Sequence, residues 1–154
     1  MLVANPIVSI RFDQIEMPIS KICQIKLDNL YTIWTQHENS YSEGYTKNDA
    51  IQYAISLNHF YSNTALPFFK KFNSLDKVWK EYLDTDRNNL TSFLTNSGNL
   101  LFYRELILNS KYDIDKTKQY YEMINKELEP YKGKEVYKEI IENLETLYKS
   151  LSLR

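Results

Sequence analysis

Hydrophobic residues alternate with other residues in two short stretches near the start of the chain. In "IVSIRF", residues 7–12, every second residue from Val8 to Phe12 is hydrophobic, which is typical of a strand with one buried face. The stretch "LYTIWTQ", residues 30–36, is rich in β-branched and aromatic residues. The pattern predicts a strand pair at about 7–12 and 30–36. Between them it predicts a short helix at about 18–27, with Pro18 in its first turn.

From residue 48 onward, hydrophobic residues recur every three or four positions, the spacing of one face of a helix. About six helices are therefore expected, including a short one around 85–94 and longer ones at 73–84, 99–109, 116–129 and from 134. The last of these has a clear apolar seam, made of Tyr137, Ile140, Leu144, Leu147 and Leu151. The expected fold class is α+β, mostly α, with the strand pair followed by a helical bundle. The length fits a single domain over residues 1–154, divided into strand-helix-strand-loop (1–47) and helical (48–154) parts.

Pro67 lies in the middle of a helical pattern, and two arrangements accommodate it. Either one helix kinks at Pro67, or the first helix stops near Ser62 and a second starts with Asn63 or Thr64 as its cap. The second arrangement is favoured because a proline in the first turn of a helix loses no hydrogen bond. The sequence leaves both open.

Four aromatic residues follow this proline within a few turns: Phe68, Phe69, Phe72 and Trp79. The favoured interpretation is a corner of the hydrophobic core, where two helices meet. The alternative is that these side chains line an apolar pocket for a small molecule.

Charge and composition exclude several classes of protein. The net charge is −1, and the charges are balanced along the chain, with 7 basic and 7 acidic residues in 1–77 and 12 and 13 in 78–154. A nucleic-acid-binding protein needs a basic face, so we expect no nucleic-acid partner. We expect neither a signal peptide nor a membrane span. The single cysteine, Cys23, cannot form a disulfide within the chain, which favours a cytoplasmic location.

The residues that usually carry catalysis or bind metals are few. His37 and His59 lie 22 positions apart, without a carboxylate or cysteine at metal-ligand spacing, so each is interpreted as structural or exposed. Cys23 lies in a hydrophobic helical pattern and is interpreted as a small buried residue. We therefore expect no enzyme, no metal site and no cofactor.

The one long loop, "HENSYSEGYTK" at residues 37–47, combines acidic and aromatic residues. It is either a solvated connection or a contact loop for a protein partner. In the second case Glu38, Tyr41, Glu43 and Tyr45 are the candidate partner-binding residues, because charge steers association and tyrosine gives a large contact area. A further strand could lie within 38–47, or the exposed sheet edge could pair with a second copy in a homodimer.

The order of four stretches carries a resemblance to known proteins. These stretches are "NPIVSIRF", "LYTIWTQ", "ALPFFKKFNSLDKVWKEYL" and "LLFYRELILNSKYDIDKTKQYYEMINKEL". In this order the chain resembles a loose group of small bacterial cytoplasmic proteins of unknown function. These are similar in size and character to immunity proteins of bacterial toxin systems. The resemblance implies no catalytic residue.

The functional expectation combines the loop with this resemblance. It is a non-enzymatic, protein-binding protein, of the bacterial immunity type, that neutralises a toxin by occupying its surface. The alternative is a small-molecule-binding or regulatory helical module, with an apolar pocket near Phe68, Phe69, Phe72 and Trp79.

Overall fold

The computed structural model describes residues 3–4, 7–37, 41–42, 46–84 and 98–152. It is mostly helical, with a small antiparallel β part formed from the N-terminal third of the chain, which confirms the predicted α+β class. The strands are β1 (Val3–Ala4), β2 (Ile7–Ile10), β3 (Ile33–Gln36) and β4 (Tyr41–Ser42). The α-helices are α1 (Asp13–Cys23), α2 (Lys47–Phe60), α3 (Leu66–Lys71), α4 (Leu75–Asp84), α5 (Gly98–Tyr112), α6 (Ile114–Leu128) and α7 (Glu135–Ser152).

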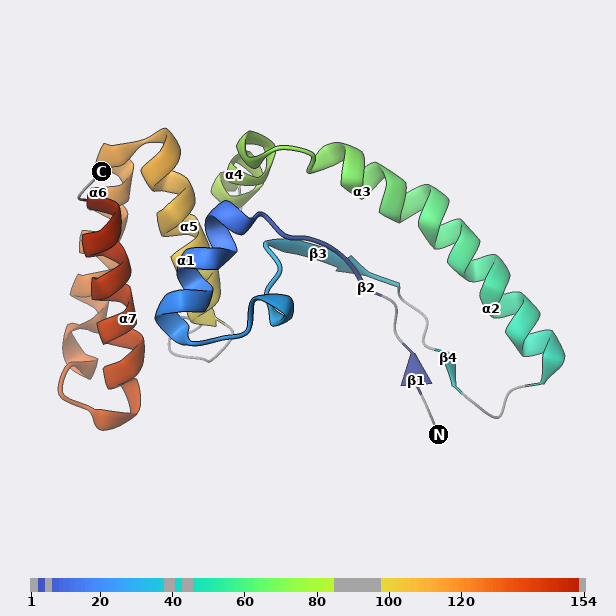
Figure 1. Ribbon diagram of the computed structural model, residues 1–154, viewed down its shortest axis with the longest axis horizontal. Helices are drawn as coiled ribbons and strands as arrows, with labels where there is room; N and C mark the ends of the chain where they lie inside the picture. The colour runs from blue at the N-terminus through green and yellow to red at the C-terminus, as the bar shows by residue number, and fades with distance from the viewer. Residues whose placement is uncertain (1–2, 5–6, 38–40, 43–45, 85–97, 153–154) are drawn as a thin grey trace.

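Helix α5 is the centre of the bundle and packs against α1, α4, α6 and α7 (Figure 1). Its segment from Phe102 to Asn109 is buried throughout. The predicted seam of α7 is confirmed, because Leu144, Leu147 and Leu151 are all buried in the core. A turn with Gly133 at a φ of 87° joins α6 to α7, a backbone conformation that glycine adopts without strain.

Helix α1 begins five residues earlier than predicted. It starts at Asp13, so Pro18 lies inside the helix and not in its first turn. The early start is stabilised by the burial of Ile15 and Glu16, whose backbone N–H groups both donate to the Phe12 carbonyl, at 2.8 and 3.1 Å. The contacts of this first turn with the core outweigh the hydrogen bond that Pro18 cannot donate.

Strands β2 and β3 form an antiparallel pair, from Ile7 opposite Gln36 to Ile10 opposite Ile33. We call this pair the hairpin, although α1 and η1 lie between its two strands. Both strands are shorter than predicted, because α1 follows β2 closely and a 3₁₀ turn, η1 (Leu27–Asn29), precedes β3. The expected alternation is present along β2, where Ile7 is exposed and Val8 is half-buried. Beyond the hairpin, β1 pairs with β4, which confirms a further strand within residues 38–47.

Residues 47–71 form one continuous helix, which we call the arm (Figure 1). Helix α2 ends at Phe60 and Pro67 lies in the first turn of α3, as the favoured arrangement predicted. The predicted cap at Asn63 or Thr64 is wrong, because the chain stays helical between α2 and α3. Between α2 and α3 the chain makes a π-turn, η2 (Tyr61–Ala65), in which the Leu66 N–H donates to the carbonyl of Tyr61, five residues earlier. A π-turn directly before Pro67 changes the backbone pairing where the proline cannot donate, so the helix continues without a new cap.

The remaining predicted helices are found close to their expected positions. Helix α4 begins at Leu75, two residues after the expected cap Asn73, and α5 and α6 extend the predicted 99–109 and 116–129 helices by a few residues. The short helix expected around 85–94 lies outside the described residues.

Candidate functional site

The arm carries an unusually long stretch without charge. Between Asp49 and Lys70 the sequence contains no Asp, Glu, Lys or Arg, although 25% of the whole chain is charged. A helix with one side in solvent normally places charged residues on that side. In α2, however, no residue is fully buried. Residues 50–60 of the arm therefore combine exposure with an absence of Asp, Glu, Lys and Arg.

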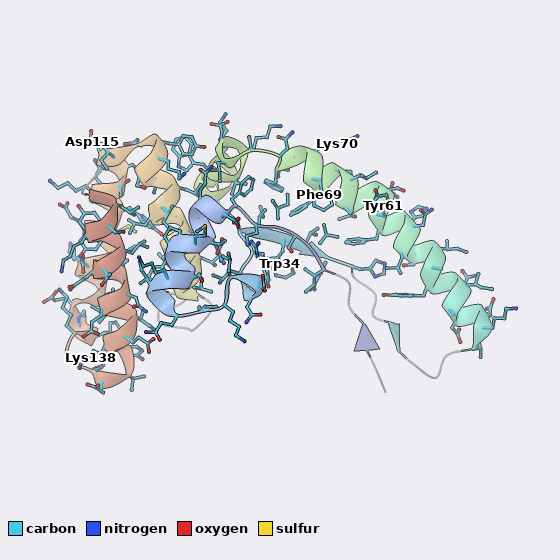
Figure 2. The ribbon with its side chains drawn as sticks, in the orientation of Figure 1. Trp34, Tyr61, Phe69, Lys70, Asp115 and Lys138 are labelled. Atoms are coloured by element: carbon cyan, nitrogen blue, oxygen red, sulfur yellow. The ribbon has the colours of Figure 1, made fainter. Side chains whose placement is uncertain are left out.

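Large hydrophobic side chains occupy the exposed parts of this stretch. Ile51 and Ile55, four positions apart on one face of α2, are 49% and 53% exposed. Tyr61, Leu66 and Phe69 are also exposed further along the arm, and Figure 2 labels Tyr61 and Phe69 there. An exposed and largely apolar helix is typical of a surface that another molecule covers.

The hairpin beside the arm is also incompletely covered. Ile7 and Trp34 lie on its exposed face, which includes the pair Ser9 and Trp34 (Figure 2). The Trp34 ring makes an edge contact with Tyr31, at a centroid separation of 6.2 Å. Exposed apolar groups are thus present on both the arm and the hairpin, the two parts that lie outside the helical bundle (Figure 1).

The four predicted partner-binding residues belong to the segment between β3 and α2. Tyr41 lies in β4, opposite Ala4. Glu38, Glu43 and Tyr45 lie outside the described residues. The segment leads into the start of α2, which is the end of the arm furthest from the bundle (Figure 1). That these residues contact a partner stays a prediction.

Thr46 and Asp49 cap the start of α2. The Thr46 hydroxyl accepts the Asp49 N–H at 3.3 Å, and the Asp49 carboxylate accepts the Thr46 N–H at 2.8 Å. This reciprocal capping box satisfies two backbone groups at the free end of the arm. The hydrogen bonds from Thr46 also lower the pKa of Asp49 below its ordinary value.

A polar pocket of about 370 Å³ lies between β3 and the arm. His37, directly after β3, is buried, and its Nε2 shares a hydrogen bond of 2.8 Å with the Ser56 hydroxyl of α2. The rings of Tyr53 and Phe60 contact the imidazole edge-on, at centroid separations of 5.8 and 5.2 Å. These contacts hold His37 in one orientation and attach the hairpin to the arm.

The second histidine lines the same pocket. His59 lies on α2, and its Nδ1 accepts a hydrogen bond of 2.8 Å from the side-chain amide of Asn63 in η2. From the sequence, His37 and His59 are two separate residues without a shared site. Their proximity depends on how the hairpin packs on the arm, so no local spacing in the sequence indicates it.

Two histidines in one pocket raise the question of a metal site. Within the described part of the chain, no cluster of three or more His, Cys, Asp or Glu residues has the geometry to hold a metal ion. The pocket offers hydrogen-bonding side chains, namely two imidazoles together with hydroxyl and amide groups.

The aromatic residues predicted as an alternative ligand pocket face different surroundings. Phe68 and Phe72 are buried in the core with their rings 5.1 Å apart, which confirms the core interpretation for these two residues. Phe69 is 42% exposed. Trp79 stacks on Tyr112 at 4.7 Å, and its indole N–H donates to Asn109 at 2.9 Å. A pocket shared by Phe68, Phe69, Phe72 and Trp79 stays a prediction.

Comparisons with models of protein families, with curated proteins and with solved structures find no match to this chain. Among the helices of the described residues, none has both the length and the hydrophobicity needed to cross a membrane. The case for a function therefore depends on the surface and the pocket of the molecule itself.

Proposed function

We propose that this protein is a non-enzymatic binding protein that acts by covering the surface of a protein partner with its arm. The observation that carries the proposal is the stretch between Asp49 and Lys70, which has no Asp, Glu, Lys or Arg and whose α2 part contains no buried residue and displays Ile51 and Ile55. Protein interfaces exclude charge from their centre and use aromatic and aliphatic groups as anchors. The arm offers this composition along a continuous helix.

The partner class is a toxin, and the protein is a cytoplasmic immunity protein of a bacterial toxin system. The resemblance in the order of the sequence elements supports this class. The acidic residues Glu38 and Glu43 lie in the segment before the arm, where their charge would steer a basic partner towards the apolar face. The toxin would be neutralised by occupation of its surface, without any covalent step.

The experiment measures the affinity for a toxin encoded beside this protein's gene. Ile51→Asp/Ile55→Asp places two charges on the proposed contact face, and we expect the dissociation constant measured by calorimetry to rise at least tenfold. The matched control is Val136→Asp on α7, because Val136 is a hydrophobic residue that is 83% exposed and lies outside the arm. The control should bind as the wild type does.

A second set of variants tests the segment before the arm. Replacement of Glu38, Tyr41, Glu43 and Tyr45 by alanine should also weaken binding, mostly through a slower association rate at low salt. If both sets of variants bind the toxin as tightly as the wild type, neither the arm nor the segment is the contact surface and the proposal fails.

A second copy of the chain is the alternative partner for the arm. An exposed, uncharged helix can pair with its own copy around a two-fold axis. Analytical ultracentrifugation of the wild type and of Ile51→Asp/Ile55→Asp separates the two cases. A wild-type dimer that becomes a monomer in the variant assigns the arm to self-association.

A further inference from the structure

We infer that the pocket between β3 and the arm binds a small uncharged ring compound with several hydrogen-bonding groups, the chemistry that nucleobases and monosaccharides share. This goes beyond the proposed function, because it concerns different residues of the arm and a different kind of ligand. It depends on the size of the pocket, the chemistry of its wall and the fixed position of its polar groups.

The size of the pocket suits a small ligand. Its volume of about 370 Å³ is within the range of small-molecule sites, which begins at about 300 Å³. The wall is contributed by two separate parts of the chain, the end of β3 and the middle of the arm. A bound molecule would therefore contact the hairpin and the arm at the same time.

The wall has no permanently charged side chain. None of the eight residues that line this pocket is Asp, Glu, Lys or Arg, and its ionisable groups are the imidazoles of His37 and His59. A charged group that enters a partly desolvated site without a counter-charge loses more hydration free energy than neutral hydrogen bonds restore. The wall consequently favours an uncharged molecule over its phosphorylated or carboxylated counterpart.

The same wall is rich in neutral hydrogen-bonding groups. Thr35, Ser56 and Thr64 contribute hydroxyl groups, and Gln36 and Asn63 contribute amides, each of which can both donate and accept. Phe60 adds an apolar ring beside them. A ring compound with several polar substituents matches this mixture, because its edge can hydrogen-bond while its face contacts the phenyl group.

Several of these groups are already held in place. The buried His37 contacts Ser56 and two aromatic rings, and the exposed His59 accepts a hydrogen bond from the Asn63 amide. Asn63 and Thr64 belong to the π-turn, so their directions are set by the irregular turn and not by a regular α-helix. π-turns are frequent at functional sites, and preorganised polar groups lower the entropic cost of binding.

The test uses four neutral probes, adenosine, uridine, D-glucose and D-galactose, each titrated into the full chain with amide chemical shifts and Tm as the two measurements. We expect at least one probe to shift the amides of residues around the pocket and to raise Tm by about 5 to 10 °C at 100-fold excess over its Kd. Binding of the nucleosides alone or of the sugars alone identifies which of the two sources supplies the ligand. AMP and glucose 6-phosphate should bind at least tenfold more weakly than their neutral parents.

A matched pair of variants locates the binding. Asn63→Ala removes an amide from the wall, whereas Asn58→Ala removes an exposed amide of the same helix that does not line the pocket. We expect Asn63→Ala to weaken the binding of the neutral probe at least tenfold and Asn58→Ala to leave it unchanged. Thr64→Val, which removes only a hydroxyl group and keeps the side-chain shape, provides a second variant should Asn63→Ala disturb the fold.

Three outcomes would overturn the inference. They are the absence of any shift with all four probes, equal affinity in the wild type and both pocket variants, and tighter binding of the phosphorylated compounds. None of these outcomes affects the proposed contact with a toxin, because the toxin test uses substitutions of Ile51 and Ile55, which do not line this pocket.

Discussion

Arg104 of α5 and Glu16 of α1 form a two-pronged ion pair inside the protein. The Arg104 Nε donates to Oε1 of Glu16 at 2.8 Å, and Nη2 donates to Oε2 at 3.0 Å. The Glu16 side chain has no exposed surface, and that of Arg104 is 8% exposed. The Thr32 hydroxyl also donates to Glu16 at 2.8 Å and accepts the Phe12 N–H at 3.0 Å. This network joins two helices of the bundle to the segment that leads into β3.

Loss of one member of the pair should destabilise the fold strongly. Arg104→Ala leaves the Glu16 carboxylate buried without its counter-charge, and we expect the free energy of unfolding to decrease by about 3–5 kcal/mol. Urea denaturation followed by circular dichroism measures the change. The double variant Glu16→Met/Arg104→Met buries no unpaired charge and should lose less than Arg104→Ala. A single variant within about 1 kcal/mol of the wild type would show that the pair is not buried as described.

Alkaline pH should destabilise the protein through Cys23. Burial, together with the negative charge of Glu139, raises the pKa of the Cys23 thiol from 9.0 to about 11. Between these values the unfolded chain releases the thiol proton while the folded chain retains it, so the free energy of unfolding decreases as the pH rises from about 9 towards 11. Burial also raises the pKa of Tyr103, and its contribution begins only above its ordinary value of 10.0.

Over about pH 8 to 10, comparison with a variant that lacks the thiol gives the contribution of the cysteine. In urea titrations over this range, the wild type should lose stability with rising pH, and Cys23→Ala should lose less. If the free energy of unfolding changed with pH equally in the two proteins, the folded chain would not be holding the Cys23 thiol protonated.

Pro67→Ala tests whether the π-turn has relieved the strain of the proline. A proline forced into a regular helix interior costs about 3 kcal/mol, so its removal would stabilise a strained arm by about that amount. Because η2 already changes the pairing before Pro67, we expect a change in the free energy of unfolding within about 1 kcal/mol, including the greater entropy of the unfolded chain without proline. A gain near the full cost, about 3 kcal/mol in chemical denaturation, would indicate a strained arm.

The parts of the fold that depend on local periodicity were predictable from the sequence. The seam through Leu144, Leu147 and Leu151 needs only the helical repeat of about 3.6 residues, and these residues are buried as expected. The ends of helices were less predictable where they were placed from the position of a proline. Pro18 and Pro67 both lie inside helices, because tertiary contacts in one case and a π-turn in the other compensate for the missing donor.

The candidate site was predictable only in part. From the sequence, the expected contact surface was the loop at 37–47, and no exposed apolar face on the arm was predicted. The pocket could not be predicted either, because His37 bonds Ser56 and shares a pocket with His59 only when β3 packs beside α2. The absence of charge between Asp49 and Lys70 is visible in the sequence, but its meaning requires the finding that this helix is exposed.

The π-turn also changes the direction in which the later side chains of the arm point around the helix axis. An α-helix rotates by about 100° per residue, so one additional residue in a turn rotates everything after it relative to everything before it. Before η2, Tyr53 and Phe60 contact His37 beside the hairpin; after it, Phe68 and Phe72 enter the core. One continuous helix therefore packs against the hairpin with its first part and against the core with its last part. Deletion of one residue from η2 would rotate the side chains after it by about 100° relative to those before it. The two sets could then no longer meet the hairpin and the core at the same time, although no contact residue is replaced.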